Sequence, residues 1–483
     1  MCTGIRVAAA RTGLVLAVVA ALLTACGHGS ATGPAAMSAQ LSGRIDAIVT
    51  AHKNAGLLPA VSVAVVDPVR GRYIHAYGSA DLATGRAAGV GDHFRIGSVA
   101  TTFIATAVLR LADAGRLSLD DPVARYIADV PRGDTMTVRD LLGARSGVYD
   151  FLDAPETLAA QYTGDSGWND QQTIRAIAAH PAKAAAPRTG TAYSNSEPVL
   201  LGSILEKVTG KSVDNAIGDI VTGDGLRDTT TLPDRGTALP APALHGYAYP
   251  RDTPVDLTAQ LTAPLFEAAG TMQSTITDLA RYAPLLAHGN LLNPQTAQAR
   301  TQFTDLSQPR ERQLEPHEQY GLGLMRTGQW IGFDSTVSGR LTDLGYTTTI
   351  GYLPDRDATV VVTTNLGASP PGITAATLWA DIVHALYPGT LPDSDTAPTM
   401  PVPTAADLDV QLSRALDPTR PAAAKSLRVE GSDADPDLIT RVAQAYHDTF
   451  ATTIRVVATT ELRPGVMVAT TTKPRMAQEP SPR

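Results

Sequence analysis

The sequence predicts an α+β fold for the long central part of the chain, with a sheet that receives strands from both ends of that part. Two stretches of strand-forming residues open it, at 61–66 and 73–77, and two more close it, at 347–353 and 359–364. The chain between them carries helical patterns. Helices enclosed by strands in this order are typical of a sheet that joins the N- and C-terminal pieces of a domain.

Glycine and proline mark where these elements end. Residues 67–71 form the turn between the first two strands, and Pro354 and Asp355 form the turn between the last two. Gly115 and Gly210 each end a helix, because glycine readily adopts the backbone conformation that terminates helices. The expected helices span residues 98–114, 200–208 and 374–386.

The composition is that of a soluble globular chain long enough for two or three domains. Of the 483 residues, 43% are hydrophobic and 18% are charged, which argues against a disordered chain and a polytopic membrane protein. The formal net charge is -8 and no basic stripe is present, so we do not expect a nucleic-acid partner. Two cysteines, scattered histidines and the lack of phosphate-binding or dinucleotide-binding motifs predict no metal site and no cofactor.

The first residues have the features of an export signal. A basic start precedes an apolar run at 14–23, which is too short for a membrane span of about 20 residues. Residues 23–26, Leu-Thr-Ala-Cys, resemble the bacterial lipobox, whose cysteine carries lipid and becomes the new N-terminus. The resemblance implies a signal peptide at 1–25, a lipidated Cys26 with a tether at 26–40, and an exported protein anchored on the outer face of the cell membrane. A plain cleaved signal and an uncleaved anchor are the alternatives.

The remaining chain divides into four sections. The densely patterned domain spans residues 41–391, and a linker rich in proline, aspartate and threonine follows at 392–403. Residues 404–473 contain two helical and two strand-like stretches, which predicts a small α+β domain. Residues 474–483 are expected to form a disordered tail.

One serine stands where a helix begins. Residues 94–99 read Phe-Arg-Ile-Gly-Ser-Val and lead into the helix expected from Ser98. The first turn of a helix has free backbone N–H groups and the positive end of the helix dipole. Ser98 is therefore interpreted either as an N-cap or as a nucleophile whose developing oxyanion those N–H groups stabilise. On the serine alone, the N-cap is favoured.

Further motifs in the same chain favour the nucleophile. They lie at residues 94–102, 115–122, 137–142, 146–147, 193–195, 274–280, 320–323 and 345–346. In this order they resemble the superfamily of serine β-lactamases and penicillin-binding proteins, in the branch of class C β-lactamases, D-alanyl-D-alanine carboxypeptidases and esterases. The resemblance implies a β-lactamase/transpeptidase-like fold, with an antiparallel sheet flanked by helices and an all-helical subdomain.

The resemblance also implies a reaction and its residues. Ser98 would attack a carbonyl to form an acyl-enzyme, Tyr193 would shuttle the proton, and Asn195 would orient the substrate. The substrate would be a cell-wall peptide, a β-lactam or an ester, so a small-molecule or peptidoglycan-derived ligand is expected. By the residues alone, Tyr193 is equally a packed aromatic side chain, and Asn195 is equally a cap for the helix that follows.

The departures from the superfamily pattern concern the proton acceptor. The nucleophile motif is Ser-x-x-Lys, but Thr101 stands at the position of the lysine. A partly desolvated lysine can accept the serine proton, whereas a threonine hydroxyl is no more basic than serine itself. Tyr193 could act as the base only if its pKa fell by about three units from about 10, and the sequence offers no nearby cation that would lower it.

A second motif is missing as well. The superfamily carries Lys- or His-x-Gly on a strand beside the site, and its place falls near residues 339–341, Gly-Arg-Leu. Arg340 could hold a substrate carboxylate there, or it is an exposed loop arginine. Ala144 stands where a histidine is usual.

Two functions follow from these observations. One is a serine hydrolase with acyl-enzyme chemistry at Ser98, impaired by Thr101. The other is a catalytically degenerate relative that binds a cell-envelope ligand or partner. Residues 408–472 resemble a small secreted antigen domain of actinobacteria, which implies a pocket or docking surface whose protein partner is left open; a structural appendage is the alternative.

Overall fold

The computed structural model describes most of the central part of the chain. The described residues are 35–56, 58–154, 156–157, 168–181, 184–223, 225–231, 238–248, 254–258, 272–306, 318–336, 345–367, 373–392, 412, 456–463 and 466–471. Several expectations lie wholly or mostly outside them: the signal peptide, Cys26 and its tether, Arg340, the linker, the tail and most of the section 404–473. No helix among the described residues is both long enough and apolar enough to cross a membrane.

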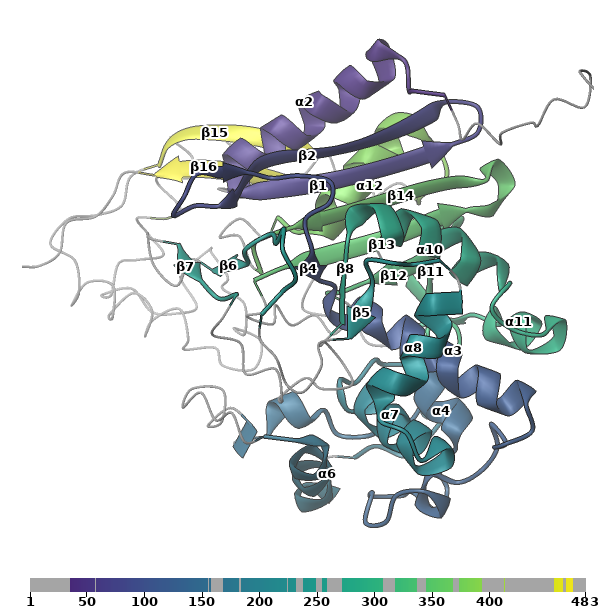
Figure 1. Cartoon of the computed structure of the whole chain (residues 1–483). Coiled ribbons are helices and arrows are strands. Elements are labelled where there is room, and N and C mark those ends of the chain that lie inside the picture. Colours follow the sequence, from purple (N-terminus) through teal and green to yellow (C-terminus); the bar gives the residue numbers. More distant parts are fainter. Residues whose placement is uncertain are drawn as a thin grey trace, which may run out of the picture.

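A nine-stranded sheet forms the centre of the molecule, and both ends of the domain contribute to it (Figure 1). Its strand order is β3-β2-β1-β14-β13-β12-β11-β10-β9, and every neighbouring pair is antiparallel. The strands are β1 (Ala60–Asp67), β2 (Gly71–Asp81), β3 (Arg86–Ala87), β9 (Thr304–Asp305), β10 (Glu318–Tyr320), β11 (Met325–Thr327), β12 (Trp330–Asp334), β13 (Thr347–Leu353) and β14 (Ala358–Thr364). The predicted pairing of N- and C-terminal strands is confirmed, because Val61 of β1 lies opposite Thr364 of β14.

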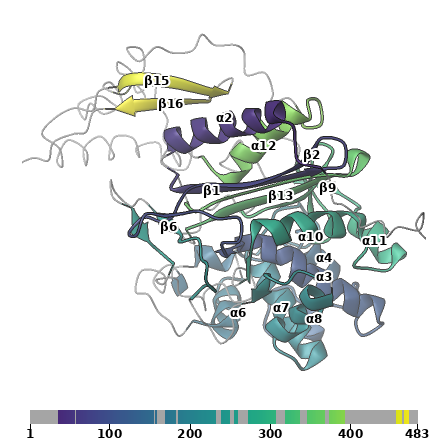
Figure 2. The same ribbon diagram turned by 45° about the horizontal axis from the view of Figure 1, so that its top comes forward.

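Helices cover both faces of this sheet (Figure 2). Helices α2 (Ala39–Gly56) and α12 (Ala375–Leu386) lie on one face, and α10 (Ile276–His288) lies on the other. Strands β13 and β14 are therefore buried on both faces and contain almost no charged residues, as expected for doubly covered strands. The core accordingly forms two clusters of buried apolar side chains, one on each face.

A helical subdomain packs on the α10 side of the sheet (Figures 1 and 2). It contains α3 (Ala100–Asp113), α4 (Val138–Leu142), α6 (Asp170–Ala179), α7 (Ser196–Thr209) and α8 (Val213–Gly223). The predicted α+β class, with a helical subdomain beside an antiparallel sheet, is confirmed. The expected glycine stops are confirmed too, since Gly115 and Gly210 have φ of 67° and 71°.

Small sheets connect the two parts. Strands β4 (Phe94–Arg95), β5 (Thr230–Thr231) and β8 (Met272–Ser274) form a three-stranded sheet, and β6 (Tyr247–Ala248) pairs with β7 (Val255–Asp256). The short helix α11 is Pro294–Arg300. In the C-terminal section, β15 (Val456–Arg463) and β16 (Val466–Thr471) form an antiparallel hairpin, in agreement with the two strand-like stretches expected there.

Candidate active site

Ser98 lies in a tight turn between strand β4 and helix α3. The turn is a 3-10 helix, Gly97–Val99, and Gly97 enters it with φ of 54°, a conformation that suits glycine. The N-cap positions of the turn and of α3 are Ile96 and Val99, and no side chain caps either start. The interpretation of Ser98 as an N-cap is therefore wrong. Ser98 is buried, 8% exposed, and the turn that contains it lies beside strands β12 and β13.

The hydroxyl groups of Ser98, Thr101 and Tyr193 lie together; we call them the hydroxyl cluster. Thr101 lies one helical turn after the serine, and its Oγ1 is 3.1 Å from the phenol oxygen of Tyr193. The Ser98 hydroxyl lies near enough to the phenol to lower its pKa. The structure thus brings Ser98 and Tyr193 into the same region. The residue that stands in place of the lysine contributes a hydroxyl to the same cluster.

Tyr193 is a phenol in surroundings that disfavour its ionisation. Burial raises the pKa of Tyr193 well above its usual value, and the nearby carboxylates of Glu197 and Asp150 raise this pKa further. The neighbouring hydroxyls of Thr101 and Ser98 lower this pKa but do not offset the burial. These surroundings therefore disfavour the phenolate form of Tyr193, which is the form that would accept the proton of Ser98.

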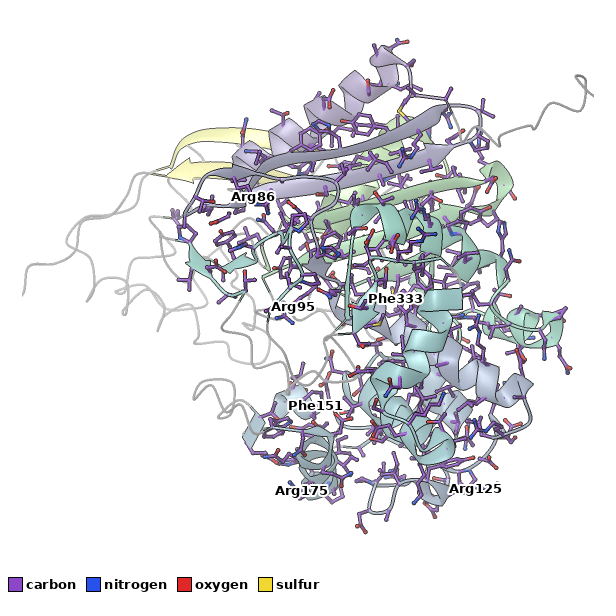
Figure 3. All side chains as sticks on the ribbon, viewed as in Figure 1. Arg86, Arg95, Arg125, Phe151, Arg175 and Phe333 are labelled. Atoms are coloured by element: carbon purple, nitrogen blue, oxygen red, sulfur yellow. The ribbon has the colours of Figure 1, made fainter. Side chains whose placement is uncertain are left out.

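Two further aromatic rings stand behind this phenol. The ring of Tyr193 lies 6.2 Å from that of Tyr320 and 6.3 Å from that of Phe333, and the latter two lie 6.1 Å apart. Tyr320 and Phe333 are buried, while Tyr193 is half-buried. Figure 3 labels Phe333 in the layer between the large sheet and the helical subdomain. This apolar backing is the physical source of the desolvation that raises the pKa of the phenol.

Asn195 occupies the N-cap position of α7 but does not cap it. Its backbone lies in the helical region, φ -62° and ψ -16°, and its side chain makes no capping bond, so the cap interpretation is wrong. Instead, Asp150 binds it: Oδ2 of Asp150 accepts hydrogen bonds from Asn195 Nδ2 at 2.7 Å and from its backbone N–H at 3.1 Å. The other oxygen of Asp150 accepts from the N–H of Leu152. The amide of Asn195 is therefore held by a carboxylate that sequence analysis did not identify.

A buried glutamate supports the same region, and sequence analysis missed it as well. Glu197, 2% exposed, accepts hydrogen bonds from Ser146 Oγ at 2.6 Å and from the N–H of Ser194 at 3.3 Å. Burial raises its pKa to about 8. Glu197 thus ties the loop after α4 to the Tyr-Ser-Asn segment. Its only signal in the sequence is an acidic residue in the first turn of a helix, which is ordinary there.

Two buried arginines near α3 donate hydrogen bonds to backbone carbonyl and hydroxyl groups. Arg300 is fully buried and donates to Thr106 Oγ1 at 2.9 Å and to the carbonyl of Thr102 at 3.3 Å. Burial lowers its pKa to about 10. Arg95, which lies just before the turn of Ser98, donates to the carbonyl of Thr258 at 3.4 Å, and burial lowers its pKa too (Figure 3).

The role predicted for Arg340 stays a prediction, because Arg340 lies outside the described residues. Within the described ranges, no three side chains of histidine, cysteine, aspartate or glutamate come together in a way that could hold a metal ion.

Comparison with known proteins identifies the family. The model of the family described as "Beta-lactamase" matches residues 45–384, which is well over half of the chain. The chain belongs to this family. A second model, "Low molecular weight antigen MTB12, C-terminal domain", matches residues 401–482. The resemblances to the β-lactamase superfamily and to the secreted antigen domain are therefore confirmed for this member of the β-lactamase family.

Two curated relatives show the range of the family. The β-lactamase-like chain is 33% identical over 201 residues to penicillin-binding protein 4 of Amycolatopsis lactamdurans, covering 40% of this chain and 48% of that protein. It is 31% identical over 205 residues to esterase EstB of Burkholderia gladioli, covering 40% of this chain and 52% of the esterase. The chain thus spans about half the length of these relatives.

Solved structures agree with the fold. A D-stereospecific amidohydrolase from Streptomyces sp. superposes with a TM-score of 0.59 at 27% identity, over 71% of this chain and 99% of the amidohydrolase. A D-amino acid amidase from Ochrobactrum anthropi SV3, complexed with L-phenylalanine amide, superposes with a TM-score of 0.62 at 24% identity, over 71% and 98%. At that identity the amidase supports the fold alone. The chain is thus a member of a serine hydrolase family that includes penicillin-binding proteins and esterases.

Proposed function

We propose that the chain is an exported, lipid-anchored protein that binds a small cell-envelope ligand at its hydroxyl cluster and turns it over slowly or not at all. One observation carries this proposal: the side chain at the position of the motif lysine is Thr101, and its partner is a phenol that burial keeps protonated. The serine therefore lacks a proton acceptor among the residues that surround it in the described structure.

The energetic consequence is large. General-base assistance contributes typically 10²–10⁴-fold to such reactions, and residues that act as a unit fail together when one is lost. The hydroxyl of Thr101 cannot replace an amine, because it is no more basic than the hydroxyl it would deprotonate. Binding survives such a loss more readily than turnover, because it needs complementary groups but no proton transfer.

The ligand class and the location follow from several independent features. The relatives, a penicillin-binding protein and an esterase, favour a peptidoglycan-derived or acyl-bearing small molecule. The lipobox-like segment at 23–26 supports export and anchoring through Cys26 on the outer face of the membrane. The match to a secreted antigen domain at 401–482 is consistent with this location, and we propose that this domain adds a docking surface.

Acyl-enzyme hydrolysis at Ser98 is the second candidate. It is favoured by the position of Ser98 at the start of α3, where backbone N–H groups and the helix dipole would stabilise an oxyanion. Its substrate would be an ester, a β-lactam or a cell-wall peptide, and its rate would be limited by the missing base.

Covalent probes separate the two candidates. The chain lacking residues 1–26 would be incubated with fluorescent penicillin and with a fluorophosphonate, beside its Ser98→Ala variant and an active penicillin-binding protein as positive control. We expect no labelling of Ser98 under conditions that fully label the control, together with a rise in melting temperature on addition of muropeptides. Labelling that disappears in Ser98→Ala would establish the hydrolase instead.

A further inference from the structure

An open groove lies on the helical subdomain, and we call it the α6–α7 groove. It is bordered by α6, by the second half of α7 and by residues 126–129, and its volume is about 1220 Å³. Figure 1 shows α6 and α7 next to each other in the lower part of the view. Its lining residues include no member of the hydroxyl cluster. Pockets for small organic ligands measure about 300–1000 Å³, so the groove has room for a short peptide.

The base of the α6–α7 groove is apolar. Ile127 and Ile174 are 8% and 7% exposed, and Ala178 lies one turn further along the same face of α6. Tyr126 lines the groove as well, but its hydroxyl donates a hydrogen bond to Asp121. Apolar side chains at the base of a groove favour a ligand that carries an aliphatic group.

Three charged side chains of the α6–α7 groove are available to a ligand. Arg175 of α6, Lys207 of α7 and Asp129 are exposed, and within the described part of the chain their side chains form no hydrogen bond or ion pair. The two other acidic residues of the lining are already engaged. Oε1 of Glu206 accepts a hydrogen bond from the first N–H of α8 at 3.1 Å, and Asp170 has a partner of its own. The groove therefore offers two positive charges and one negative charge.

The signs of these three charges select the ligand. A guanidinium such as that of Arg175 can hold a carboxylate through two parallel hydrogen bonds, and the ammonium of Lys207 attracts the same carboxylate as a point charge. The carboxylate of Asp129 attracts an ammonium group. A simple anion would meet the like charge of Asp129, and a simple cation would meet two like charges. A ligand that carries both a carboxylate and an ammonium group matches all three.

We propose that the α6–α7 groove binds a short zwitterionic peptide, with the carboxylate of the peptide at Arg175 and Lys207 and its ammonium group at Asp129. An aliphatic side chain of the peptide covers Ile127 and Ile174. This inference goes beyond the proposed function, because it assigns a second binding site in which the hydroxyl cluster takes no part.

Four forms of one tripeptide, alanyl-leucyl-alanine, test the inference. They are the free peptide, its C-terminal amide, its N-acetyl form and the form blocked at both ends. Each is titrated at pH 7 into the chain lacking residues 1–26 and followed by ligand-observed NMR. We expect the free peptide to bind roughly five- to tenfold more tightly than either singly blocked form, because each block removes one charged contact. Equal affinity of all four forms, or no binding of the free peptide, would overturn the inference.

Single substitutions assign each end of the peptide to its side of the groove. Arg175→Gln and Lys207→Gln should each reduce the preference for the free peptide over its amide. Asp129→Asn should reduce the preference over the N-acetyl form. Asparagine tolerates the backbone conformation of Asp129, with φ of 65°, so this variant changes the charge alone. Arg125→Gln is the matched control, because Arg125 is exposed but does not line the groove, and Figure 3 labels both arginines.

The control also separates this inference from the proposed function. Arg125→Gln should leave both preferences unchanged, and an equal loss in this variant would show a general effect of charge and overturn the inference. If the free peptide binds but the three substitutions in the groove leave its preferences unchanged, the peptide lies elsewhere. The groove inference is then overturned, and the proposed binding at the hydroxyl cluster is unaffected.

Discussion

Buried polar groups have different kinds of partner on the two faces of the large sheet. On the face covered by α2 and α12, two buried side chains have well-matched partners: His52 Nε2 lies 2.6 Å from Asp381 Oδ2, and the indole N–H of Trp379 donates to the carbonyl of Val360 at 3.0 Å. On the face of the hydroxyl cluster, Glu197 accepts hydrogen bonds from the neutral groups of Ser146 and Ser194, and the nearby carboxyl group of Asp150 raises its pKa further.

This difference indicates that the first face contributes mainly to stability and the second mainly to function. Charged groups that are buried without an opposite charge cost folding free energy, and proteins retain them mainly where a binding or catalytic site requires them. The family relationship explains why such a site exists in this chain, and we propose that the threonine at the position of the motif lysine leaves its remaining groups without a proton relay. Four changes test this comparison.

The largest effect is expected for Glu197→Gln. Burial raises the pKa of Glu197 to about 8, from an ordinary value of 4.5. The folded state therefore binds a proton that the unfolded state has lost, so stability falls as the pH rises from about 5 to about 8. Glutamine keeps an acceptor for Ser146 and cannot ionise. In urea unfolding at pH 5 and pH 8, the wild type should lose roughly 3–5 kcal/mol more stability between these values than the variant. Equal losses would mean that Glu197 ionises freely.

Thr101→Lys adds a cationic side chain to the hydroxyl cluster. A lysine at position 101 would reach Ser98 from the same helix face, and its amine, partly desolvated beside the ring of Tyr193, could accept the serine proton. We expect hydrolysis of p-nitrophenyl acetate to rise about 10²-fold, equivalent to about 2.7 kcal/mol. Ser98→Ala in the same background is the control and should remove the gain. An unchanged rate would show that the site lacks more than the lysine.

The sequence predicted the fold better than it predicted the site. Strands β13 and β14 are runs of threonine, valine and isoleucine, and a turn with Pro354 separates them, so local propensity and burial agree. The motif order placed Ser98, Thr101 and Tyr193 together, because it reports an inherited geometry.

Sequence analysis did not identify Asp150 and Glu197, for a physical reason. Asp150 and Glu197 acquire their roles from burial and from partners about 50 residues away along the chain, which no local pattern encodes. The sequence alone equally predicts a helix cap at Asn195, because asparagine before a helix normally caps it. Its helical backbone conformation and the competing carboxylate of Asp150 prevent this.

Removing a hydrogen-bond partner on the face covered by α2 and α12 should lower the free energy of unfolding without affecting the candidate active site. Asp381→Ala leaves His52, which is 3% exposed, without the partner of its Nε2, and unpaired buried polar groups cost about 1–3 kcal/mol. The exposed pair of Asp120 and Arg139 offers the matched control, because Asp120→Ala should cost less than about 1 kcal/mol. Urea unfolding measures both costs, and the rise in melting temperature on addition of muropeptides should be unchanged in either variant. Equal costs would show that the His52 pair is no better buried than a surface ion pair.

The smallest effect is expected for Arg300→Met on the other face. Within the described residues Arg300 donates hydrogen bonds to Thr102, Thr106 and Gly323 but forms no ion pair with a carboxylate. Methionine fills a similar volume and removes the cost of burying the charge, which offsets the lost hydrogen bonds. The free energy of unfolding should therefore fall by less than about 1 kcal/mol, less than for Asp381→Ala. A loss greater than that of Asp381→Ala would mean that the guanidinium is a net stabiliser, and that the face of the hydroxyl cluster bears no cost for its buried charges.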